Sequence, residues 1–263
     1  MSAANGRNLD ALVGRLPRVQ GGETSTDLVL SCHRGGNADV FPLVLRLHVA
    51  PGAKVADVTY GGGVFWRNVP KGAYDLRATD IRNGVDCRSL PYADGEMDAV
   101  VLDPPYMEGA TRKTAYATGQ SQFADYYGLK RIAYGGDRYH GAILRLYLDA
   151  AKEAKRVLRN GGTLIVKCMD EVCANRQRLT HVEIVSALEA DGMVCKDLFV
   201  VMRTNRPCVS RIKRQVHARK NHSYFLVFVK GARYSANPKV LVPRAPRGNE
   251  QPVVGTLNSG GDK

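Results

Sequence analysis

Apolar residues recur along the middle of the chain with two different periods. Runs rich in apolar, β-branched and aromatic residues predict strands. They cover residues 54–60, 73–81, 97–106, 163–171, 195–204 and 222–231. Apolar residues at helical spacing predict helices over residues 40–49, 140–160 and 180–192. Because strands and helices alternate, the sequence predicts an α/β fold with a mostly parallel sheet and helices on both faces.

Local signals predict where two of these helices begin or end. Gly161 and Gly162 follow the strongly amphipathic segment 140–160 and predict the C-cap of its helix. Thr180, with Glu183 three residues later, predicts a capping box at the start of the next helix.

The two ends of the chain differ in composition from the middle. Residues 1–22 are rich in Gly, Asn and Arg, and residues 232–263 contain many Pro and Gly without apolar periodicity. Such segments bury too little surface to offset the entropy of the chain, so both are predicted to be flexible. A single domain is therefore expected over residues 23–231.

Two segments interrupt the regular order of strands and helices. Residues 107–139 are polar, rich in Gly and Tyr, and long for a connection, which predicts a mobile, functional insertion. Residues 205–221 form a connection that contains six basic residues and no acid. The six are Arg206, Arg211, Lys213, Arg214, Arg219 and Lys220.

The charge balance indicates an anionic partner. The chain has 38 Lys and Arg against 25 Asp and Glu, which gives a net charge of +13 and a pI near 9.6. A domain this basic is attracted to phosphate, so nucleic acid is the first candidate and a merely basic or ribosome-associated protein is the alternative.

Cysteine spacing and hydropathy give further expectations. The six cysteines form no C-x-x-C pair, so neither a metal site nor a disulfide framework is predicted. No apolar stretch has the length of a membrane span, and the first residues lack the apolar region of a signal peptide. The expected location is therefore the reducing cytoplasm.

A glycine cluster and two acids follow the first predicted strands. Residues 57–63 read DVTYGGG, which allows a sharp turn and close approach to a ligand but lacks the G-K-[ST] of a triphosphate loop. Asp80 ends the next strand, where a carboxylate would bind the ribose hydroxyls of an adenosine; a solvated strand-end aspartate is the alternative. Asp86 and Cys87 are placed to meet an adenine edge.

The most informative motif is D-P-P-Y, formed by Asp103, Pro104, Pro105 and Tyr106. The amino group of a nucleic-acid base is a weak nucleophile because its lone pair is delocalised into the ring. The Asp103 carboxylate and the Pro104 carbonyl would accept its two N–H groups, and Pro105 keeps residue 104 extended. Tyr106 would stack on the base. A turn that merely ends a strand is the alternative.

These motifs resemble the DNA N6-adenine/N4-cytosine amino-methyltransferases, which share a Gly-rich loop and a (D/N/S)-P-P-(Y/F/W) motif. The resemblance covers residues 26–230 and includes DVTYGGGVFW, DPPY, GGTLIVKCMDE and RQVHARKNHSYFLVFVK. These last strands are similar to those of bacterial and phage site-specific enzymes, of the kind found in restriction–modification systems. The resemblance implies a Rossmann-like seven-stranded sheet whose last strand is antiparallel, S-adenosylmethionine as methyl donor, and a flipped target base.

The resemblance also assigns roles to residues. The loop would hold the methionine part of the cofactor, Asp80 its ribose, and Asp103 to Tyr106 the target base. The loop residues are Asp57, Thr59, Tyr60, Gly61 and Gly63. Thr59 departs from the family, which has an aromatic residue there, and no large target-recognition domain follows the last strand.

Adenine N6 in DNA is the preferred target because D-P-P-Y is commoner there, and cytosine N4 or an RNA base are the alternatives. An inactive nucleic-acid-binding protein of the same fold would have lost one of the motifs. In the preferred interpretation the basic connection 205–221 binds phosphates while the insertion 107–139 closes over the flipped base. Its tyrosines offer stacking faces: Tyr116, Tyr126, Tyr127 and Tyr134.

Overall fold

The computed structural model describes residues 28–106, 139–204 and 214–231. The predicted flexible ends, residues 1–22 and 232–263, lie outside the described residues. So does the insertion 107–139 apart from its last residue, together with Arg206, Arg211 and Lys213 of the basic connection.

Seven strands form one sheet in the order β1-β8-β9-β5-β4-β2-β3. β9 is antiparallel to its neighbours β5 and β8, and the other pairs are parallel. This sheet confirms the predicted α/β fold and the antiparallel last strand. The strands are β1 (Cys32–Arg34), β2 (Lys54–Asp57), β3 (Asp75–Ala78), β4 (Met97–Leu102), β5 (Leu158–Cys168), β8 (Met193–Met202) and β9 (His222–Lys230).

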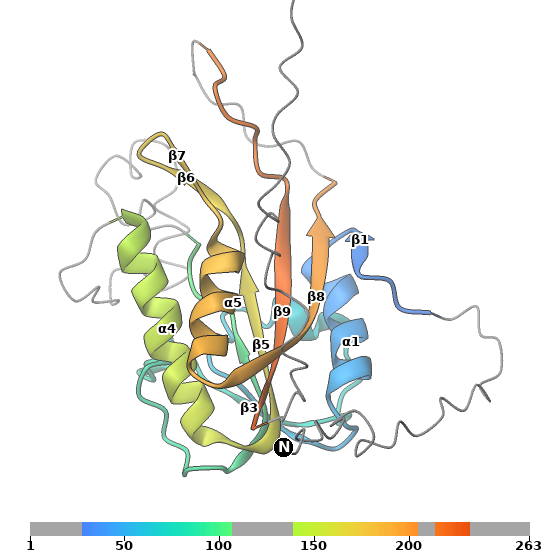
Figure 1. Ribbon diagram of the computed structural model, residues 1–263. Coiled ribbons are helices and arrows are strands. Elements are labelled where there is room, and N and C mark those ends of the chain that lie inside the picture. Colours follow the sequence, from blue (N-terminus) through green and yellow to red (C-terminus); the bar gives the residue numbers. More distant parts are fainter. Residues whose placement is uncertain (1–27, 107–138, 205–213, 232–263) are drawn as a thin grey trace, which may run out of the picture.

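Helices cover both faces of the sheet. Helix α1 (Asn37–His48) lies on one face, whereas α4 (Tyr139–Val157) and α5 (Thr180–Ala190) lie side by side on the other (Figure 1). Two short 3-10 helices, η2 (Val64–Asn68) and η3 (Ile81–Asn83), follow β2 and β3. The three helices therefore confirm the predicted segments, with α1 beginning three residues earlier than expected.

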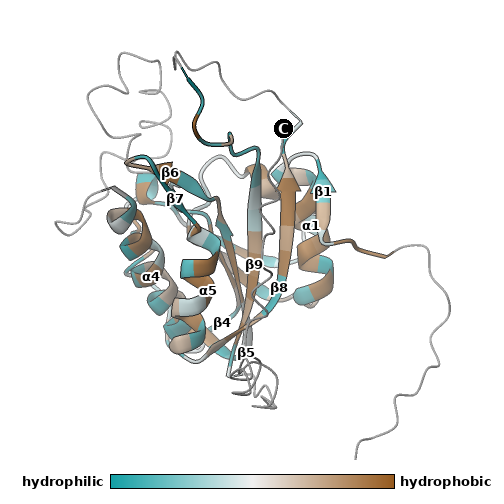
Figure 2. Cartoon of the chain, turned by 45° about the horizontal axis from the view of Figure 1, so that its top comes forward, coloured by the Kyte–Doolittle hydropathy of each residue, from teal (hydrophilic) through white to brown (hydrophobic). Residues whose placement is uncertain are grey.

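Each face of the sheet has its own apolar core. Tyr147 of α4 and Leu188 of α5 pack on the face of β5 that carries Val166. Phe41 of α1 packs on the opposite face, which carries Ile165. The helices show hydrophobic and hydrophilic patches along their lengths, as helices with one buried face do (Figure 2). Burial on both faces explains why β4 and β5 read as continuous apolar runs.

The end of α4 was predicted wrongly. The helix ends at Val157, and β5 begins at once with Leu158, which pairs with Met97 of β4. Gly161 and Gly162 lie inside β5, next to an irregularity in its pairing with β4. A Cβ on Gly162 would lie 2.8 Å from the Arg159 carbonyl oxygen, so the glycine serves close strand packing rather than a helix cap.

The capping box at α5 was also predicted wrongly. Leu179 is the N-cap, and Thr180 is already in the helix, with a buried side chain. The Glu183 carboxylate binds His140 of α4 at 2.7 Å instead of the helix N-terminus. Tertiary contacts have replaced the local cap.

Two short features were not predicted. β1 is a three-residue edge strand, and β6 (Glu171–Cys173) pairs with β7 (Arg176–Arg178) in a separate hairpin. In Figure 1 this hairpin extends beyond the end of β5, at the top of the sheet.

The parallel strands β2, β3, β4 and β5 present their carboxyl ends at that same edge, where ligands bind in open α/β sheets. Among residues 28–106, 139–204 and 214–231, none of the helices has the length and apolar composition of a membrane span.

Candidate active site at the carboxyl edge of the sheet

The first part of the site is the loop after β2. Asp57 ends the strand and is buried, and its Oδ2 accepts a hydrogen bond of 2.7 Å from the Trp66 indole. Its Oδ1 accepts the Thr59 amide at 3.2 Å. Burial raises the pKa of Asp57 to about 7, although these two hydrogen bonds act to lower it. Asp57 thus stabilises the loop through the Thr59 amide and the Trp66 indole.

Two of the predicted glycines are required by the shape of this loop. Gly61 and Gly63 have positive φ of 55° and 66°, which residues with a Cβ rarely adopt. A Cβ on Gly63 would also lie 2.5 Å from the Tyr60 hydroxyl, so the tyrosine side chain lies against this glycine. The backbone at Gly61 meets the second part of the site, because its amide donates to Asp80 Oδ2 at 2.8 Å.

Asp80, after β3, is buried and holds this loop in place. Besides the Gly61 amide, its carboxylate accepts the Arg82 amide at 2.9 Å and the Arg82 Nε at 3.1 Å. The Arg82 guanidinium also donates to the Gly61 carbonyl. Nearby, the Arg88 guanidinium binds both oxygens of Asp86 and lowers the pKa of that carboxyl. Both predicted acids therefore have arginine partners.

The D-P-P-Y motif directly follows β4 and is joined to the loop. The Asp103 amide donates to Thr59 Oγ1 at 2.6 Å, and the Tyr106 hydroxyl donates to Asp103 Oδ1 at 2.7 Å. Burial raises the pKa of Asp103 to about 6, while the Tyr106 hydrogen bond and the Lys167 charge act in the opposite direction. The motif thus presents a carboxylate whose second oxygen, Oδ2, is not engaged by the Tyr106 contact.

Pro104 presents its carbonyl beside this carboxylate. The Tyr147 hydroxyl lies 3.3 Å from the Pro104 oxygen and 2.9 Å from the Lys167 oxygen. A hydroxyl has one hydrogen, and the shorter contact is with Lys167. The Pro104 oxygen therefore retains capacity to accept a hydrogen bond from a ligand.

A narrow cleft brings most of the predicted residues together. It encloses about 50 Å³ beside the D-P-P-Y motif. The predicted residues along it are Thr59, Asp80, Asp86, Cys87, Asp103, Pro104 and Pro105, and the others are Val58, Ile81, Arg88 and Leu146. The remaining predicted residues are absent from this lining: Asp57, Tyr60, Gly61, Gly63 and Tyr106.

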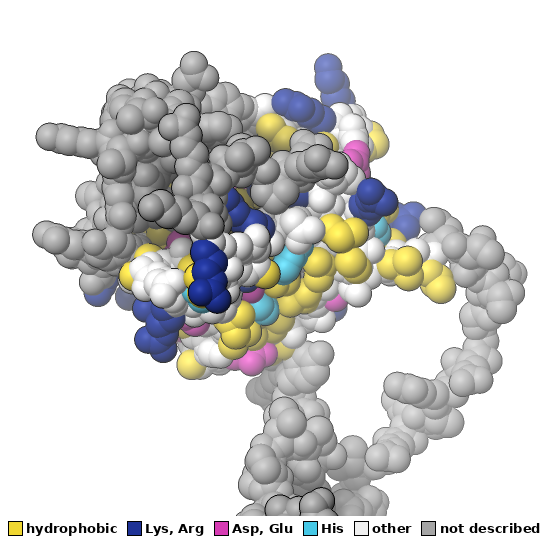
Figure 3. Space-filling model, turned by 90° about the horizontal axis from the view of Figure 1, so that it is seen from above, with side chains coloured by type: hydrophobic (Ala, Val, Ile, Leu, Met, Phe, Trp, Pro, Cys, Tyr) yellow, Lys and Arg dark blue, Asp and Glu magenta, His cyan; other side chains and the backbone are white. Residues whose placement is uncertain are grey.

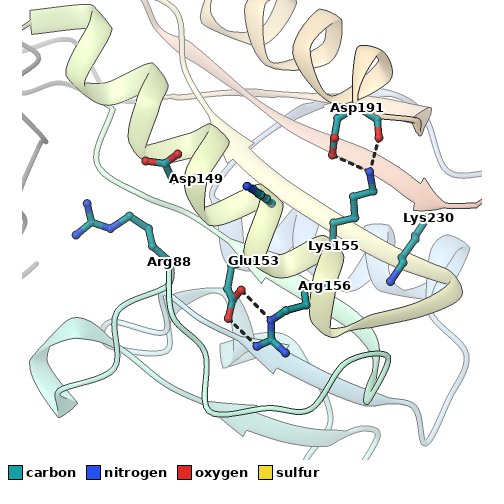
Figure 4. Close-up of a pocket in the computed structure, with 8 residues that line it drawn as sticks. Arg88, Asp149, Glu153, Lys155, Arg156, Asp191 and Lys230 are labelled. Carbon is teal, nitrogen blue, oxygen red and sulfur yellow. Dashed lines mark hydrogen bonds and ion pairs between the residues drawn. The ribbon is translucent and has the colours of Figure 1, made fainter.

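A second hollow, of about 710 Å³, is larger but chemically different. It lies along α4, shares Arg88 with the narrow cleft, and is lined mainly by charged side chains (Figure 4). Some of those charges are paired within the protein, as Glu153 with Arg156 and Lys155 with Asp191. The hollow has none of the loop or D-P-P-Y residues in its lining, whereas the narrower cleft has several of them, so the narrower cleft is the candidate site.

The sequence interpretation missed a buried lysine next to the motif. Lys167 of β5 has no exposed surface, and its Nζ donates to Ser223 Oγ of β9 at 2.6 Å. The ammonium also lies 4.4 Å from the centre of the Phe225 ring. The available signal was one charge inside the apolar run TLIVKC, since lysine is rarely fully buried.

Two histidines, His140, which is buried, and His181, which is half-buried, join the β6–β7 hairpin and its base to the two helices. His140 of α4 contacts Glu171 at 2.8 Å and Glu183 at 2.7 Å. His181 of α5 contacts Asp170 at 2.7 Å. These contacts fix the hairpin at the carboxyl edge and turn the acids at its base inward.

Three of the predicted DNA-contacting residues lie in the described part of the chain. Arg214 and Arg219 are exposed and Lys220 is half-buried, just before β9. In the same segment, His217 Nε2 lies 3.2 Å from the carbonyl and side-chain oxygens of Asn175 at the tip of the β6–β7 hairpin. The basic segment and the hairpin are therefore neighbours.

Comparisons with solved structures find methyltransferases of low similarity. TrmN from Thermus thermophilus is 18% identical, with a TM-score of 0.42, 74% of this chain covered and 50% of that one. TTHA0409, also from Thermus thermophilus and in complex with S-adenosyl-L-methionine, is 14% identical, with a TM-score of 0.34 and coverages of 69% and 57%. A SAM-dependent methyltransferase from Methanosarcina mazei is 11% identical, with a TM-score of 0.40 and coverages of 71% and 96%.

This chain spans about half the length of the first two of these proteins. No curated protein sequence matches the chain. Residues 97–254, more than half of the chain, match the N6/N4 methyltransferase family, described as DNA methylase. The match includes D-P-P-Y, β5 and β9, and it confirms the resemblance found in the sequence together with S-adenosylmethionine as the cofactor. The chain therefore belongs to the N6/N4 DNA methylase family.

Proposed function

We propose that this protein transfers a methyl group from S-adenosylmethionine to the exocyclic amino group of a base in DNA, with adenine N6 as the preferred target. The observation that carries the proposal is the pairing of two acceptors, the Asp103 carboxylate and the Pro104 carbonyl, along one cleft at the carboxyl edge of the sheet. A base amino group has two N–H donors and needs such a pair.

The two acceptors would make the amine nucleophilic. When Asp103 and the Pro104 oxygen each accept one N–H, the nitrogen lone pair is localised and turned away from both acceptors. When bound, S-adenosylmethionine supplies the methyl group: the new N–C bond forms as the S–C bond breaks, and a neutral thioether leaves. The nitrogen then sheds one proton, for which the hydrogen-bonded Asp103 carboxylate, with a pKa of about 6, is a suitable acceptor.

The residues of the cleft suit the cofactor. Asp80 is a buried acceptor for ribose hydroxyls, and the apolar side chains of Ile81 and Leu146 lie along the same cleft. S-adenosylmethionine would bind along this cleft, where the enclosed volume is about 50 Å³. Arg82, which holds Asp80 at 3.1 Å, would then yield that carboxylate to the ribose.

Charge at the carboxyl edge supports a nucleic-acid substrate. Asp170 and Glu171, at the base of the β6–β7 hairpin, are buried against histidines, whereas Arg176 is exposed. Lys and Arg side chains lie at several points of the part of this face that is visible, with smaller areas of acidic side chains between them (Figure 3). We infer that the hairpin arginines, Arg176 and Arg178, bind phosphates together with Arg214, Arg219 and Lys220 of the neighbouring basic segment.

The rest of the predicted interface, including Arg206, Arg211 and Lys213 and the tyrosines of the insertion, remains part of this proposal. Cytosine N4 and RNA bases are the alternative targets, because the same acceptor pair fits any exocyclic amine. Adenine is preferred because D-P-P-Y is commoner than S-P-P-Y among the adenine enzymes of the resembling family. An inactive protein of the same fold is disfavoured because the loop, Asp80 and D-P-P-Y are all intact and adjacent.

Expression in a host without DNA methylation tests the choice of base. Genomic DNA and total RNA are digested to nucleosides and analysed by mass spectrometry. We expect N6-methyladenine in DNA when the protein is expressed and none with the empty vector. N4-methylcytosine alone would refute the adenine preference, and methylation confined to RNA would refute DNA as the substrate.

A further inference from the structure

A buried ammonium group lies near Asp103 and, within the described residues, has no hydrogen-bonded carboxylate. Lys167 is fully buried, and its contacts within the described residues are the Ser223 hydroxyl at 2.6 Å and the face of Phe225 at 4.4 Å. Burial of a charged group is unfavourable unless opposite charge lies nearby. A serine and an aromatic ring compensate only part of that cost, so a charged neighbour is needed.

The register of the sheet identifies Asp103 as that neighbour. Val101 pairs with Ile165 and Leu102 pairs with Val166 in the parallel β4–β5 ladder. Asp103 directly follows β4 and Lys167 is the next residue of β5, so continuing this register brings the two backbones side by side. The Lys167 side chain lies on the face of β5 that carries Ile165, against Phe225. The charges of Asp103 and Lys167 act on each other, and each favours the ionised form of the other.

Other charged and titratable groups around Asp103 come from four elements. Asp57 of β2 lies close enough for its pKa to be raised by the Asp103 charge. Tyr106 donates to Asp103, and Arg203, after β8, acts with Lys167 to lower the Asp103 pKa against the effect of burial. Tyr147 and Cys168, on the α4 and β5 sides, have pKa values raised by burial and by the Asp103 charge. Lys167 is the buried cation of this group.

We propose that Lys167 is a positioning residue that acts through Asp103: its buried ammonium keeps the neighbouring side chain in the carboxylate form while the target amine is bound. This inference rests on the proposed function. A protonated Asp103 would carry an O–H donor and would offer one acceptor fewer to the amine. Lys167 therefore extends the pH range in which the acceptor pair is complete.

The titration of Asp103 can be measured without any substrate. In protein labelled with ¹³C at aspartate carboxyl carbons, the Asp103 signal is assigned by its loss in Asp103→Asn. We expect Lys167→Met to raise the Asp103 pKa by about one unit or more, because a nearby positive charge is removed. Lys167→Arg keeps the charge and should leave the pKa close to the wild-type value.

A second measurement covers the case in which Lys167→Met does not fold. In the wild type, burial lowers the pKa of Lys167 to about 8. The Asp103 carbon should then show a second, smaller inflection near that pH as its neighbour loses its charge. An Asp103 signal without this inflection, or an unchanged Asp103 pKa in a folded Lys167→Met, would overturn the inference.

The rate of methyl transfer separates positioning from a structural role. In Lys167→Met, the acid limb of the single-turnover pH profile should move to higher pH, and activity should be regained at high pH. In Lys167→Arg the acid limb should stay in place. Ser223→Ala, which removes the hydroxyl but keeps the ammonium, is the matched control and should not move the limb. A rate lowered equally at every pH would show a structural role. A wild type that methylates no nucleic acid would refute the proposed function and leave the titration result standing.

Discussion

Thr59 shows how one residue can depart from a family pattern and still serve the site. The family has an aromatic residue at this position, so the sequence alone indicated that one expected packing contact with the cofactor is missing. In the structure the Thr59 hydroxyl accepts the Asp103 amide at 2.6 Å, which joins the loop after β2 to the D-P-P-Y motif. Such a bond between segments 44 residues apart depends on the folded arrangement and has no local sequence signal.

We expect Thr59→Val to destabilise the protein and to slow methyl transfer. Valine has a similar shape but no oxygen, so the Asp103 amide loses its acceptor, at a typical cost of about 1–3 kcal/mol. Thr59→Ser keeps the hydroxyl and should lie close to the wild type. Urea unfolding and single-turnover rates measure both effects. Equal stability of the valine and serine variants would show that this hydrogen bond contributes nothing.

Asp80→Ala should weaken S-adenosylmethionine binding tenfold to hundredfold. Hydrogen bonds that involve a charged group contribute about 1.5–3 kcal/mol, and the variant removes the acceptor proposed for the ribose. Isothermal calorimetry measures the affinity directly. Asp80 also accepts a hydrogen bond from the Gly61 amide. Asp75→Ala, which removes an exposed acid on β3, is the control and should bind S-adenosylmethionine with the wild-type affinity. Unchanged affinity in Asp80→Ala would remove this residue from the cofactor site.

At the scale of elements, long apolar patterns were predictable and short polar ones were not. α1, α4, α5 and six of the seven sheet strands lie where hydrophobic periodicity predicts them. The β6–β7 hairpin escaped prediction because its strands have three residues each and its turn, Ala174–Asn175, lacks glycine. Both turn residues nevertheless have positive φ, 49° and 58°, as a type I′ turn requires.

The hairpin carries a prediction of its own. If Arg176 and Arg178 each bind a phosphate, their double replacement by alanine should reduce the slope of log affinity against log salt by up to about 2. Fluorescence anisotropy with duplex DNA at several salt concentrations measures that slope. S-adenosylmethionine affinity should not change, because these residues lie outside the cleft.

Lys71→Ala combined with Lys196→Ala is the matched control for the hairpin variant. It removes the same charge from exposed positions near the amino ends of β3 and β8, away from the carboxyl edge. The salt slope of this control should equal that of the wild type. If both double variants change the slope equally, general charge rather than the hairpin accounts for DNA binding.

For the whole molecule, the positions of the candidate site residues were easier to predict from the sequence than their electrostatics. The loop, Asp80 and D-P-P-Y all follow strands, so their meeting at one edge follows from the parallel sheet. Whether each charged side chain is buried or exposed does not follow from the strand pattern. Asp57 and Lys167 are both buried, the first against Trp66 of η2 and the second against Ser223 of β9.

These buried charges predict how stability depends on pH. The Asp57 pKa is raised from its ordinary value of about 4 to about 7, so the folded protein binds this proton more tightly than the unfolded chain. The resulting stabilisation is fully present below about pH 4 and is lost as the pH rises through about 7. Asp57→Asn cannot titrate and should show a smaller loss of unfolding free energy between pH 5 and pH 8, measured by urea unfolding. The same pH dependence in both proteins would contradict the burial of an ionisable Asp57.

The central claim is that Asp103 accepts the target amine while the cofactor binds elsewhere in the cleft. The most direct test follows transfer of a labelled methyl group from S-adenosylmethionine to DNA by purified wild-type protein and by Asp103→Ala, with cofactor affinity measured in parallel. We predict labelled N6-methyladenine with the wild type, no detectable transfer with Asp103→Ala, and equal cofactor affinity. Transfer by Asp103→Ala at the wild-type rate would contradict the account.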